Sequence, residues 1–563
     1  MRSQMRSVIA VSVVALSFAV VIGAQSVAPI ANAAQNGDRE TVKALLKKGI
    51  DVNEAQGDGT TALHWAAIKG DAEMARMLVY AGANVRATTR IGAYTPLYLA
   101  AKGGYSEVVA VLLTGGADAK AVTSNGTTPL MIAAAAGDTK SIISLVENGA
   151  EINATDGAKG ETPLMFAAGF NRVDAVKLLL ARGADHKATT KVVDLFALTA
   201  PEEEAMQRGQ GGNGGGARPA ATRPADVAGA TRAYRYNELI GSQGGLTALL
   251  FASRQGYTDV VKALLDGGAD INQVNAGDKT SPLLMAIING HFDLAMMLIE
   301  RGANVNQAAF NGVAPLYGVL NIQWAPKSLY PSPKAYQQQQ TTYLELMQAL
   351  LNKGADPNAR VSRKVWYQAY NSDYAGFDEA GSTPFFRAAY ASDVAAMKLL
   401  VANGADPNIG TFKPAGRPFT GEGTRQITDT SGRPPVPYGG PGVLPLHAAT
   451  GIGYGEGFAA NSHRYAPTGF MPAIKFLVEE MGADVNAADH EGNTPAHLCA
   501  SRGDNDCIKY LVSKGADVTR VNREGNTTVD MANGPVQRTQ PYPETIKLLE
   551  GLGAKNNHRC ITC

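Results

Sequence analysis

The sequence has little of what metal, redox and nucleic-acid-binding proteins use. Four cysteines and eight histidines occur among 563 residues, and the formal net charge is +1. Proteins that bind a phosphate backbone usually carry a basic patch or stripe, and no segment of this sequence stands out as one. We therefore do not expect a nucleic acid among the partners.

Long apolar runs are also missing, apart from one near the start. Two arginines precede an apolar run at residues 8–22 that small residues close, which is the pattern of a secretory signal peptide. The run is short for a membrane span of about 20 residues. Cleavage after Ala24 or Ala33 would fit, and we favour Ala24 because it leaves the first structural repeat whole. We predict a signal peptide at 1–24 and a periplasmic or secreted protein with no membrane span after its removal; an uncleaved anchor is the alternative.

Catalytic motifs are absent as well. The sequence contains no G-x-S-x-G, no H-E-x-x-H and no paired-carboxylate arrangement. We therefore predict no catalytic residue, no metal site and no cofactor, and we expect that the protein is not an enzyme.

A seven-residue pattern recurs along the chain, and it starts every 33 or 34 residues where no insertion intervenes. Its copies include TALHWAA at 61–67, TPLMFAA at 162–168, TPFFRAA at 383–389 and TPAHLCA at 494–500. In the second of these, Thr162 suits a helix N-cap and the following proline suits the first helical turn. A second apolar helix follows, and then a G-A-D-x-N type segment. One such helix pair has too little core to be stable alone, so neighbouring pairs must stack.

These two alternating patterns resemble the ankyrin repeat. The resemblance implies an all-α solenoid of about twelve helix-pair units with β-hairpin fingers, which binds a protein partner through its concave face and finger tips. It also implies structural roles for His64, His447 and His497, because the fourth position of T-P-L-H joins neighbouring repeats by hydrogen bonds.

Interruptions of the repeat divide the chain. We predict ordered insertions in the C-terminal half because aromatic residues are frequent there, whereas the first insertion is rich in glycine, arginine and proline and is expected to be disordered. The predicted segments are N-terminal repeats at 25–194, the disordered insertion at 195–246, middle repeats at 247–323, repeats with long aromatic insertions at 324–470, C-terminal repeats with a cap at 471–554 and a cysteine-containing tail at 555–563.

The aromatic insertions allow two interpretations. Their side chains form a local cap that lengthens the core, or they line a groove for a protein partner, because tyrosine, tryptophan and arginine are favoured at binding hot spots. A small-ligand receptor site at residues 451–470 is a further alternative. The candidate partner-binding residues are Trp324, Trp366, Tyr367, Tyr370, Tyr374, Arg417, Arg433, Tyr454, His463 and Arg464.

The cysteines are disulfide candidates. Cys499 and Cys507 occupy inward positions of one helix pair, where they are either buried thiols or a disulfide. Cys560 and Cys563 form a terminal C-x-x-C, for which an exported protein favours a local disulfide. With His558 they give three of the four ligands that a structural zinc site needs, so metal binding stays an alternative. A second functional hypothesis is therefore an accessory subunit of an extracytoplasmic redox or metal system.

Overall fold

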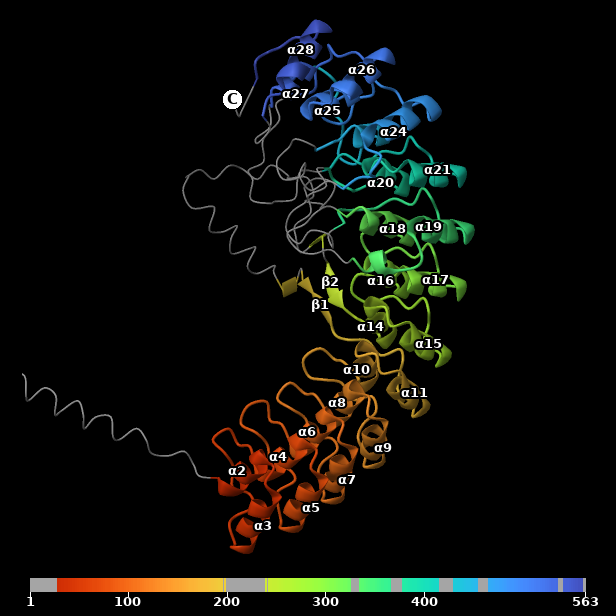
Figure 1. Ribbon diagram of the computed structural model, residues 1–563. Helices are drawn as coiled ribbons and strands as arrows, with labels where there is room; N and C mark the ends of the chain where they lie inside the picture. The colour runs from red at the N-terminus through yellow and green to blue at the C-terminus, as the bar shows by residue number, and fades with distance from the viewer. Residues whose placement is uncertain are drawn as a thin grey trace, which may run out of the picture. The chain divides into compact units, whose positions relative to one another are not determined.

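The structure is a computed structural model that describes residues 28–195, 197–198, 238–239, 241–325, 334–365, 377–414, 429–453, 464–534 and 540–559. Helices in consecutive pairs, joined by turns and loops, form the framework of this described part (Figure 1). They form two compact units. The first contains the chain up to Ala188 together with Lys262–Gly268, and the second contains Thr189–Val261 and the chain from Ala269 onward.

The first unit consists of five helix pairs. Each first helix packs on the first helix of the next pair, and the second helices α5, α7, α9 and α11 form a parallel row. The helices are α2 (Pro29–Asn36), α3 (Arg39–Lys47), α4 (Ala62–Lys69), α5 (Ala72–Tyr80), α6 (Pro96–Gly103), α7 (Ser106–Thr114), α8 (Pro129–Ala136), α9 (Thr139–Glu147), α10 (Pro163–Gly169) and α11 (Val173–Ala181).

The sequence defines the start of these first helices through threonine caps. The side chains of Thr61, Thr95, Thr128 and Thr162 each accept a hydrogen bond from the backbone N–H three residues later. This satisfies one of the N–H groups that a helix start leaves without a partner. Because helices of seven to nine residues are marginal on their own, burial of their apolar faces against neighbouring pairs supplies most of their stability.

The second unit continues the helix pairs and adds a short β-ribbon (Figure 1). Its helices are α14 (Ala248–Gln255), α16 (Pro282–Ile288), α17 (Phe292–Glu300), α18 (Pro315–Gln323), α19 (Tyr343–Asn352), α20 (Pro384–Tyr390), α21 (Val394–Ala402), α22 (Pro445–Ala449), α24 (Phe470–Lys475), α25 (Pro495–Ser501), α26 (Asn505–Ser513), α27 (Thr528–Ala532) and α28 (Pro543–Gly551), with a 3₁₀ turn η1 (Ala335–Gln338) and a π-helical turn η2 (Phe476–Glu480). The helix α15 (Thr258–Asp266) contains the boundary between the two units.

The β-ribbon lies at the two ends of the glycine-rich insertion. Strand β1 (Val192–Asp194) pairs antiparallel with β2 (Ser242–Gly244), so that Val193 faces Gln243. These strands are not expected from the sequence, and residues 199–237 between them lie outside the described part. The expected β-hairpin fingers take the form of turns, in which the described residues contain isolated bridges such as Ala55 with Thr61.

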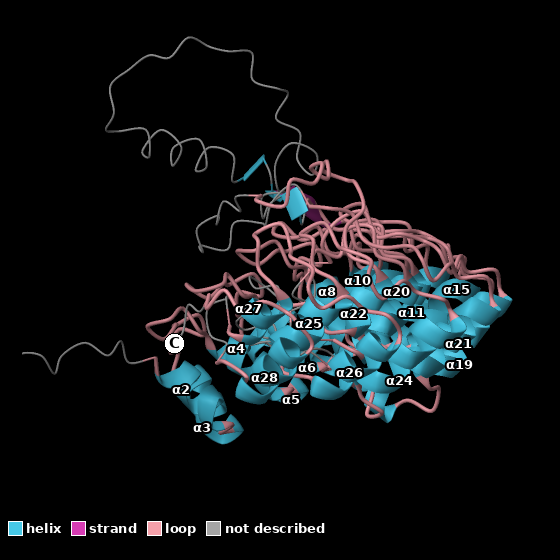
Figure 2. Cartoon of the chain, turned by 90° about the horizontal axis from the view of Figure 1, so that it is seen from above, coloured by secondary structure: helices cyan, strands magenta, loops and turns pink. Residues whose placement is uncertain are grey.

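Loops of successive repeats are joined by the asparagine of the G-A-D-x-N segment. The Oδ1 atom of Asn358 accepts the N–H of Asp406 at 2.8 Å, and its Nδ2 donates to the carbonyl of Gly404 at 2.9 Å. The same pair of bonds recurs between other repeats at Asn153, Asn306 and Asn486. Figure 2 draws the loops in pink beside the cyan helices. Among the described residues, no helix combines the length and the apolar character that crossing a membrane requires.

The asparagine hydrogen bonds predict that the loss of stability on substitution depends on which asparagine is replaced. The substitution Asn358→Ala removes two hydrogen bonds between repeats, so the free energy of unfolding should fall by about 1 kcal/mol. Asn408→Ala is the matched control, because Asn408 occupies the same motif position and its side chain donates to Asp406 of its own turn. Urea unfolding followed by circular dichroism measures both, and an equal loss in the two variants would contradict the assignment.

Candidate protein-binding surface

Trp324, a predicted partner-binding residue, packs between helix pairs. Its indole Nε1 donates to Oδ2 of Asp393 at 2.9 Å, and its ring meets the ring of Tyr343 edge-on at 6.0 Å. The Tyr343 hydroxyl donates to the same carboxylate oxygen at 2.8 Å. Burial and the charge of Asp393 raise the pKa of Tyr343. Trp324 therefore ties α18 and α19 to the start of α21.

Arg387 is a buried cation that sequence analysis missed. Its side chain lies in α20, where Nε donates to Oδ1 of Asn321 at 2.9 Å and Nη2 donates to the carbonyl of Trp324 at 2.7 Å. Burial lowers the pKa of Arg387. The available signal was a charged residue at the fifth position of T-P-F-F-R-A-A, where the other repeats place an apolar residue or glycine.

The ends of the aromatic insertion at residues 361–382 add to the core. Val361 and Val365 are buried beside Tyr317, and Phe377 packs its ring 5.1 Å from Phe386. Phe377 also lies 4.7 Å from Tyr390. These contacts are the kind that the cap interpretation of the insertions expects.

Two predicted arginines lie in the described part of the later insertions. The backbone N–H of Arg433 donates to Oγ of Ser431 at 3.2 Å, and Arg464 is half-buried. The other predicted residues of these insertions lie outside the described residues, where their roles stay predictions: Trp366, Tyr367, Tyr370, Tyr374, Arg417, Tyr454 and His463.

The terminal tail is anchored up to the residue before its first cysteine. The hydroxyl of Thr527 donates to the carbonyl of Lys555 at 2.6 Å, and Nη1 of Arg559 donates to the carbonyl of Glu524 at 2.7 Å. Cys560 and Cys563 lie outside the described residues. In the part of the chain that the structure describes, no group of three or more histidine, cysteine or acidic side chains is placed to hold a metal ion.

Cys499 and Cys507 lie side by side on one helix pair. Both are fully buried, their Cα atoms are 6.0 Å apart, and the structure joins their sulfur atoms. From the sequence alone, either a pair of buried thiols or a disulfide is expected at this position. The separation of the Cα atoms falls in the range that a disulfide needs.

The three histidines of the repeat pattern are buried in the first helices α4, α22 and α25. His64 accepts the N–H of Thr61 at Nδ1, while its Nε2 donates to the carbonyl of Tyr94 at 3.0 Å. His447 donates from Nε2 to the carbonyl of Asn493 at 3.0 Å, and His497 pairs through Nδ1 with the hydroxyl of Thr494 at 2.9 Å. His64 and His447 thus reach the loop of the next repeat. Burial lowers the pKa of all three, and that of His447 and His497 to about 4.

A row of apolar side chains stays accessible in the first unit. It occupies the fifth position of each seven-residue pattern, and its members are half-buried: Trp65, Leu99, Ile132 and Phe166. We call this row the first-helix stripe. Its edge is bordered by a repeat loop, because Nε1 of Trp65 donates to Oε1 of Gln56 at 2.9 Å.

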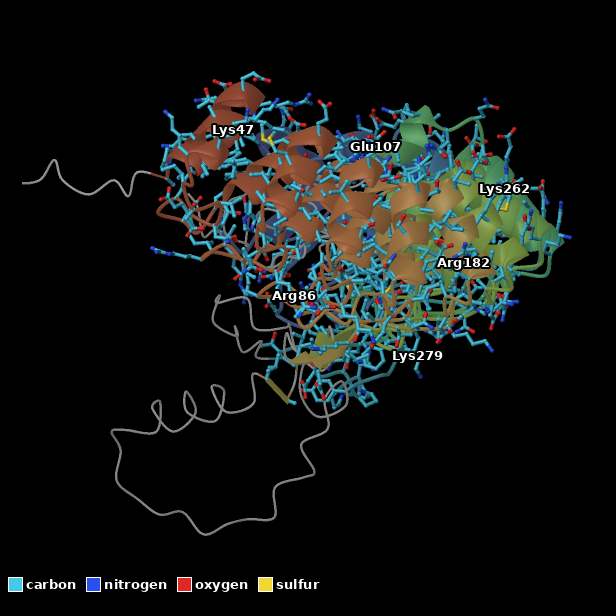
Figure 3. All side chains as sticks on the ribbon, turned by 90° about the horizontal axis from the view of Figure 1, so that it is seen from below. Lys47, Arg86, Glu107, Arg182, Lys262 and Lys279 are labelled. Carbon is cyan, nitrogen blue, oxygen red and sulfur yellow. A yellow bond between two sulfur atoms is a disulfide. The ribbon has the colours of Figure 1, made fainter. Side chains whose placement is uncertain are left out.

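In the second unit, most residues at the fifth position of the pattern are buried. Phe251 is still half-buried, but every later member is buried: Met285, Gly318, Arg387, Ala448 and Leu498. The second helices of the first unit differ again, because they extend charged side chains such as Lys47, Glu107 and Arg182 into solvent (Figure 3). The first-helix stripe is therefore a face of the first unit that can make apolar contact with another molecule.

Two family models match the sequence. The model described as Ankyrin repeats (3 copies) matches residues 24–89, 97–190, 232–309 and 462–559, and the model described as Ankyrin repeat matches residues 380–412. Together the matches cover more than half of the chain.

Curated relatives share short stretches of the sequence. Protein phosphatase 1 regulatory subunit 27 of Homo sapiens is 33% identical over 89 residues, which are 16% of this chain and 53% of the relative. Alpha-latrocrustotoxin-Lt1a of Latrodectus tredecimguttatus is 30% identical over 155 residues, or 28% of this chain and 8% of the relative. A putative ankyrin repeat protein of Fowlpox virus, FPV219, is 33% identical over 90 residues, or 16% and 20%. The chain thus spans about half, or less, of the length of these relatives.

The buried histidines predict a loss of stability in acid. Because the pKa of His447 and His497 is about 4 in the folded chain and about 6.5 when unfolded, the unfolded state binds more protons between these values. The free energy of unfolding should therefore be highest above pH 6.5 and fall towards pH 4, by up to about 3 kcal/mol per histidine. Urea unfolding measured from pH 7.5 to pH 4 tests this.

The variant His447→Gln keeps a donor near the position of Nε2 and should make this pH dependence shallower. His558→Gln is the control, because His558 is exposed. Burial and Glu491 raise the pKa of Asp489 to about 7, so protonation of this carboxyl favours the folded state as the pH falls. This effect is the same in the variant and the wild type. The difference between their pH profiles therefore measures the contribution of His447. An unchanged slope in His447→Gln would rule out its contribution.

Proposed function

Because the chain belongs to the ankyrin-repeat family, we propose that it is a non-enzymatic scaffold that binds a protein partner on the first-helix stripe of its first unit. The observation that carries this proposal is the register of the stripe. Large apolar side chains stay half-exposed at the same position of four consecutive first helices, whereas the second unit buries that position from Met285 onward.

The stripe has the properties that favour binding to another protein. Trp65 and Phe166 supply large apolar surfaces, and tryptophan is enriched at binding hot spots. Each helix that carries one of these side chains packs on the first helix of at least one neighbouring pair, so little conformational entropy is lost when a partner binds. Stacked repeats also form an extended surface, which suits a protein more than a small molecule.

The relatives support the same class of function. Two of them are named as regulatory subunits of protein phosphatase 1, and the match to regulatory subunit 12A of Mus musculus is 35% identical over 71 residues, or 13% of this chain and 7% of the relative. A regulatory subunit is by its name a partner of another protein. For this chain we propose only that it, too, binds a protein, whose identity we do not specify.

We further propose that the chain acts outside the cytoplasm. The arginine-containing start with its apolar run supports export through a signal peptide. The joined sulfur atoms of Cys499 and Cys507 support an oxidising compartment, because disulfides are rare in the cytosol. The proposed location is therefore the periplasm or the extracellular space.

Two serine substitutions in the first-helix stripe should weaken partner binding. In the double variant Ile132→Ser and Phe166→Ser, two adjacent apolar contacts are lost, and we expect affinity for the partner to fall at least tenfold. Proteins of the native extracytoplasmic fraction are captured on the wild-type chain and identified by mass spectrometry, and the affinity of each is measured with purified components.

Tyr80→Ser is the matched control, because this aromatic side chain of α5 is 96% exposed on the row of second helices. Its capture profile should equal that of the wild type. If the Ile132 and Phe166 variant captures the same proteins with the same affinity, the stripe is not the binding surface.

The oxidised state of Cys499 and Cys507 is tested separately. A disulfide that joins residues eight positions apart stabilises by about 2 kcal/mol in the chain-entropy picture, so dithiothreitol should lower the free energy of unfolding of the native protein by that amount. The variant Cys499→Ala with Cys507→Ala should show no response to the reductant. Alkylation of both thiols in the native, non-reduced but denatured protein would contradict the disulfide and weaken the case for export.

A further inference from the structure

We propose that residues 433–438, with the sequence R-P-P-V-P-Y, are a recognition peptide that a partner domain with an aromatic-lined, polyproline-specific groove binds. This site goes beyond the scaffold function, because here the chain supplies the ligand and the partner supplies the groove. We call residues 429–440 the proline strap.

The sequence of the strap enforces an extended backbone. Proline fixes its own φ near −65° and disfavours helical geometry in the residue before it. Pro434, Pro435 and Pro437 therefore restrict five consecutive residues, 433–437, to polyproline II or extended conformation. Residues 432–437 accordingly have no helix, strand or turn.

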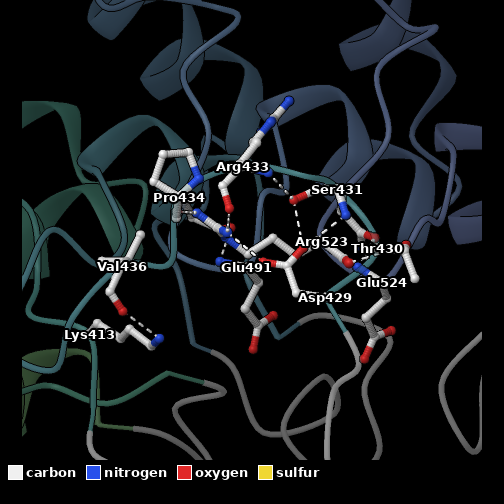
Figure 4. A network of polar contacts seen from close by, with 12 residues as sticks. Lys413, Asp429, Thr430, Ser431, Arg433, Pro434, Val436, Glu491, Arg523 and Glu524 are labelled. Carbon is white, nitrogen blue, oxygen red and sulfur yellow. Dashed lines mark hydrogen bonds and ion pairs between the residues drawn. The ribbon is translucent and has the colours of Figure 1, made fainter.

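One end of the strap is held by an arginine from the loop before α27. Nη1 of Arg523 pairs with Oδ2 of Asp429 at 2.6 Å, and Nη2 donates to the carbonyl of Pro434 at 2.8 Å (Figure 4). The N–H of Thr430 donates to the carbonyl of Arg523 at 2.8 Å. Hydrogen bonds from Ser431, together with Arg523, lower the pKa of Asp429 to about 2, so this anchor stays charged at neutral pH.

The other end is held by a lysine that precedes the strap in the same connection between α21 and α22. Nζ of Lys413 donates to the carbonyl of Val436 at 2.7 Å, as Figure 4 shows. The N–H of Lys413 donates to the carbonyl of Gly440 at 2.8 Å, and the N–H of Gly439 donates back to the carbonyl of Lys413 at 2.9 Å. Two cations from loops more than a hundred residues apart thus hold the segment between them by its carbonyl groups.

The anchored strap leaves its proline rings in solvent. Pro434, Pro435 and Pro437 are exposed, Val436 is half-buried, and Tyr438 is 51% exposed. A polyproline II helix has three residues per turn, so Pro434 and Pro437 lie on the same face. Domains with aromatic-lined grooves recognise peptides with this P-x-x-P spacing.

Anchoring lowers the entropic cost of recognition. A free peptide must be ordered when it binds, whereas the strap is already held at Arg523 and at Lys413. If the strap served the stability of the repeats alone, its proline rings would be expected to pack against the helices. Instead, backbone carbonyls make the described bonds and the rings remain available.

The test uses the full chain and a panel of purified SH3, WW and EVH1 domains, which all bind proline-rich peptides. Isothermal titration calorimetry of each domain against the wild-type chain should show binding for at least one. The double variant Pro434→Ala and Pro437→Ala should weaken that binding at least tenfold. Pro467→Ala is the matched control, because Pro467 is exposed outside the strap, and it should bind as the wild type does.

Two further variants separate the effect of anchoring the strap from that of the first-helix stripe. Arg523→Met keeps every proline but releases one anchor, so it should weaken binding several-fold. The stripe variant Ile132→Ser with Phe166→Ser should bind these domains unchanged, which distinguishes this proposal from the scaffold function. The proposal is overturned if no domain of the panel binds, or if the Pro434 and Pro437 variant binds as tightly as the wild type.

Discussion

The structure depends on the fact that each helix pair can bury its apolar side chains only against its neighbours. The first helix α8, for example, has eight residues and forms the core with the helices before and after it. Helices this short do not persist alone, so the stack is the unit of stability. Hydrogen bonds between loops reinforce the same stack, because the asparagine of one repeat bonds to the backbone of the next.

This constraint determines where the chain can carry added segments. An insertion is tolerated between two helices or between two pairs, provided that its ends rejoin the stack. The described insertion ends do so in different ways: Phe377 enters the aromatic core, strands β1 and β2 close the glycine-rich insertion, and the proline strap is anchored by Lys413 and Arg523. The added segments are therefore attached to the repeats and do not replace them.

The local pattern of the chain could be predicted from its sequence because local rules produce it. Threonine caps, proline at the first helical turn and the placement of His64 follow from a few adjacent residues. The β-ribbon, the buried Arg387 and the pairing of Asp429 with Arg523 could not be predicted, since each depends on residues tens of positions apart. The first-helix stripe is an intermediate case. Its residues were visible in the pattern, but their exposure depends on which neighbouring loops cover them.

The exposure of the fifth position of the repeat pattern differs between the two units. In the first unit the fifth position keeps Trp65 and Phe166 half-exposed, at a cost in buried apolar area that a bound partner would recover. In the second unit the same position is buried from Met285 onward. Arg387 illustrates the change, because a cation that replaces an apolar side chain is satisfied there by Asn321 and by the carbonyl of Trp324. The fifth position of the repeat is thus half-exposed in the first unit and takes part in internal packing from Met285 onward in the second.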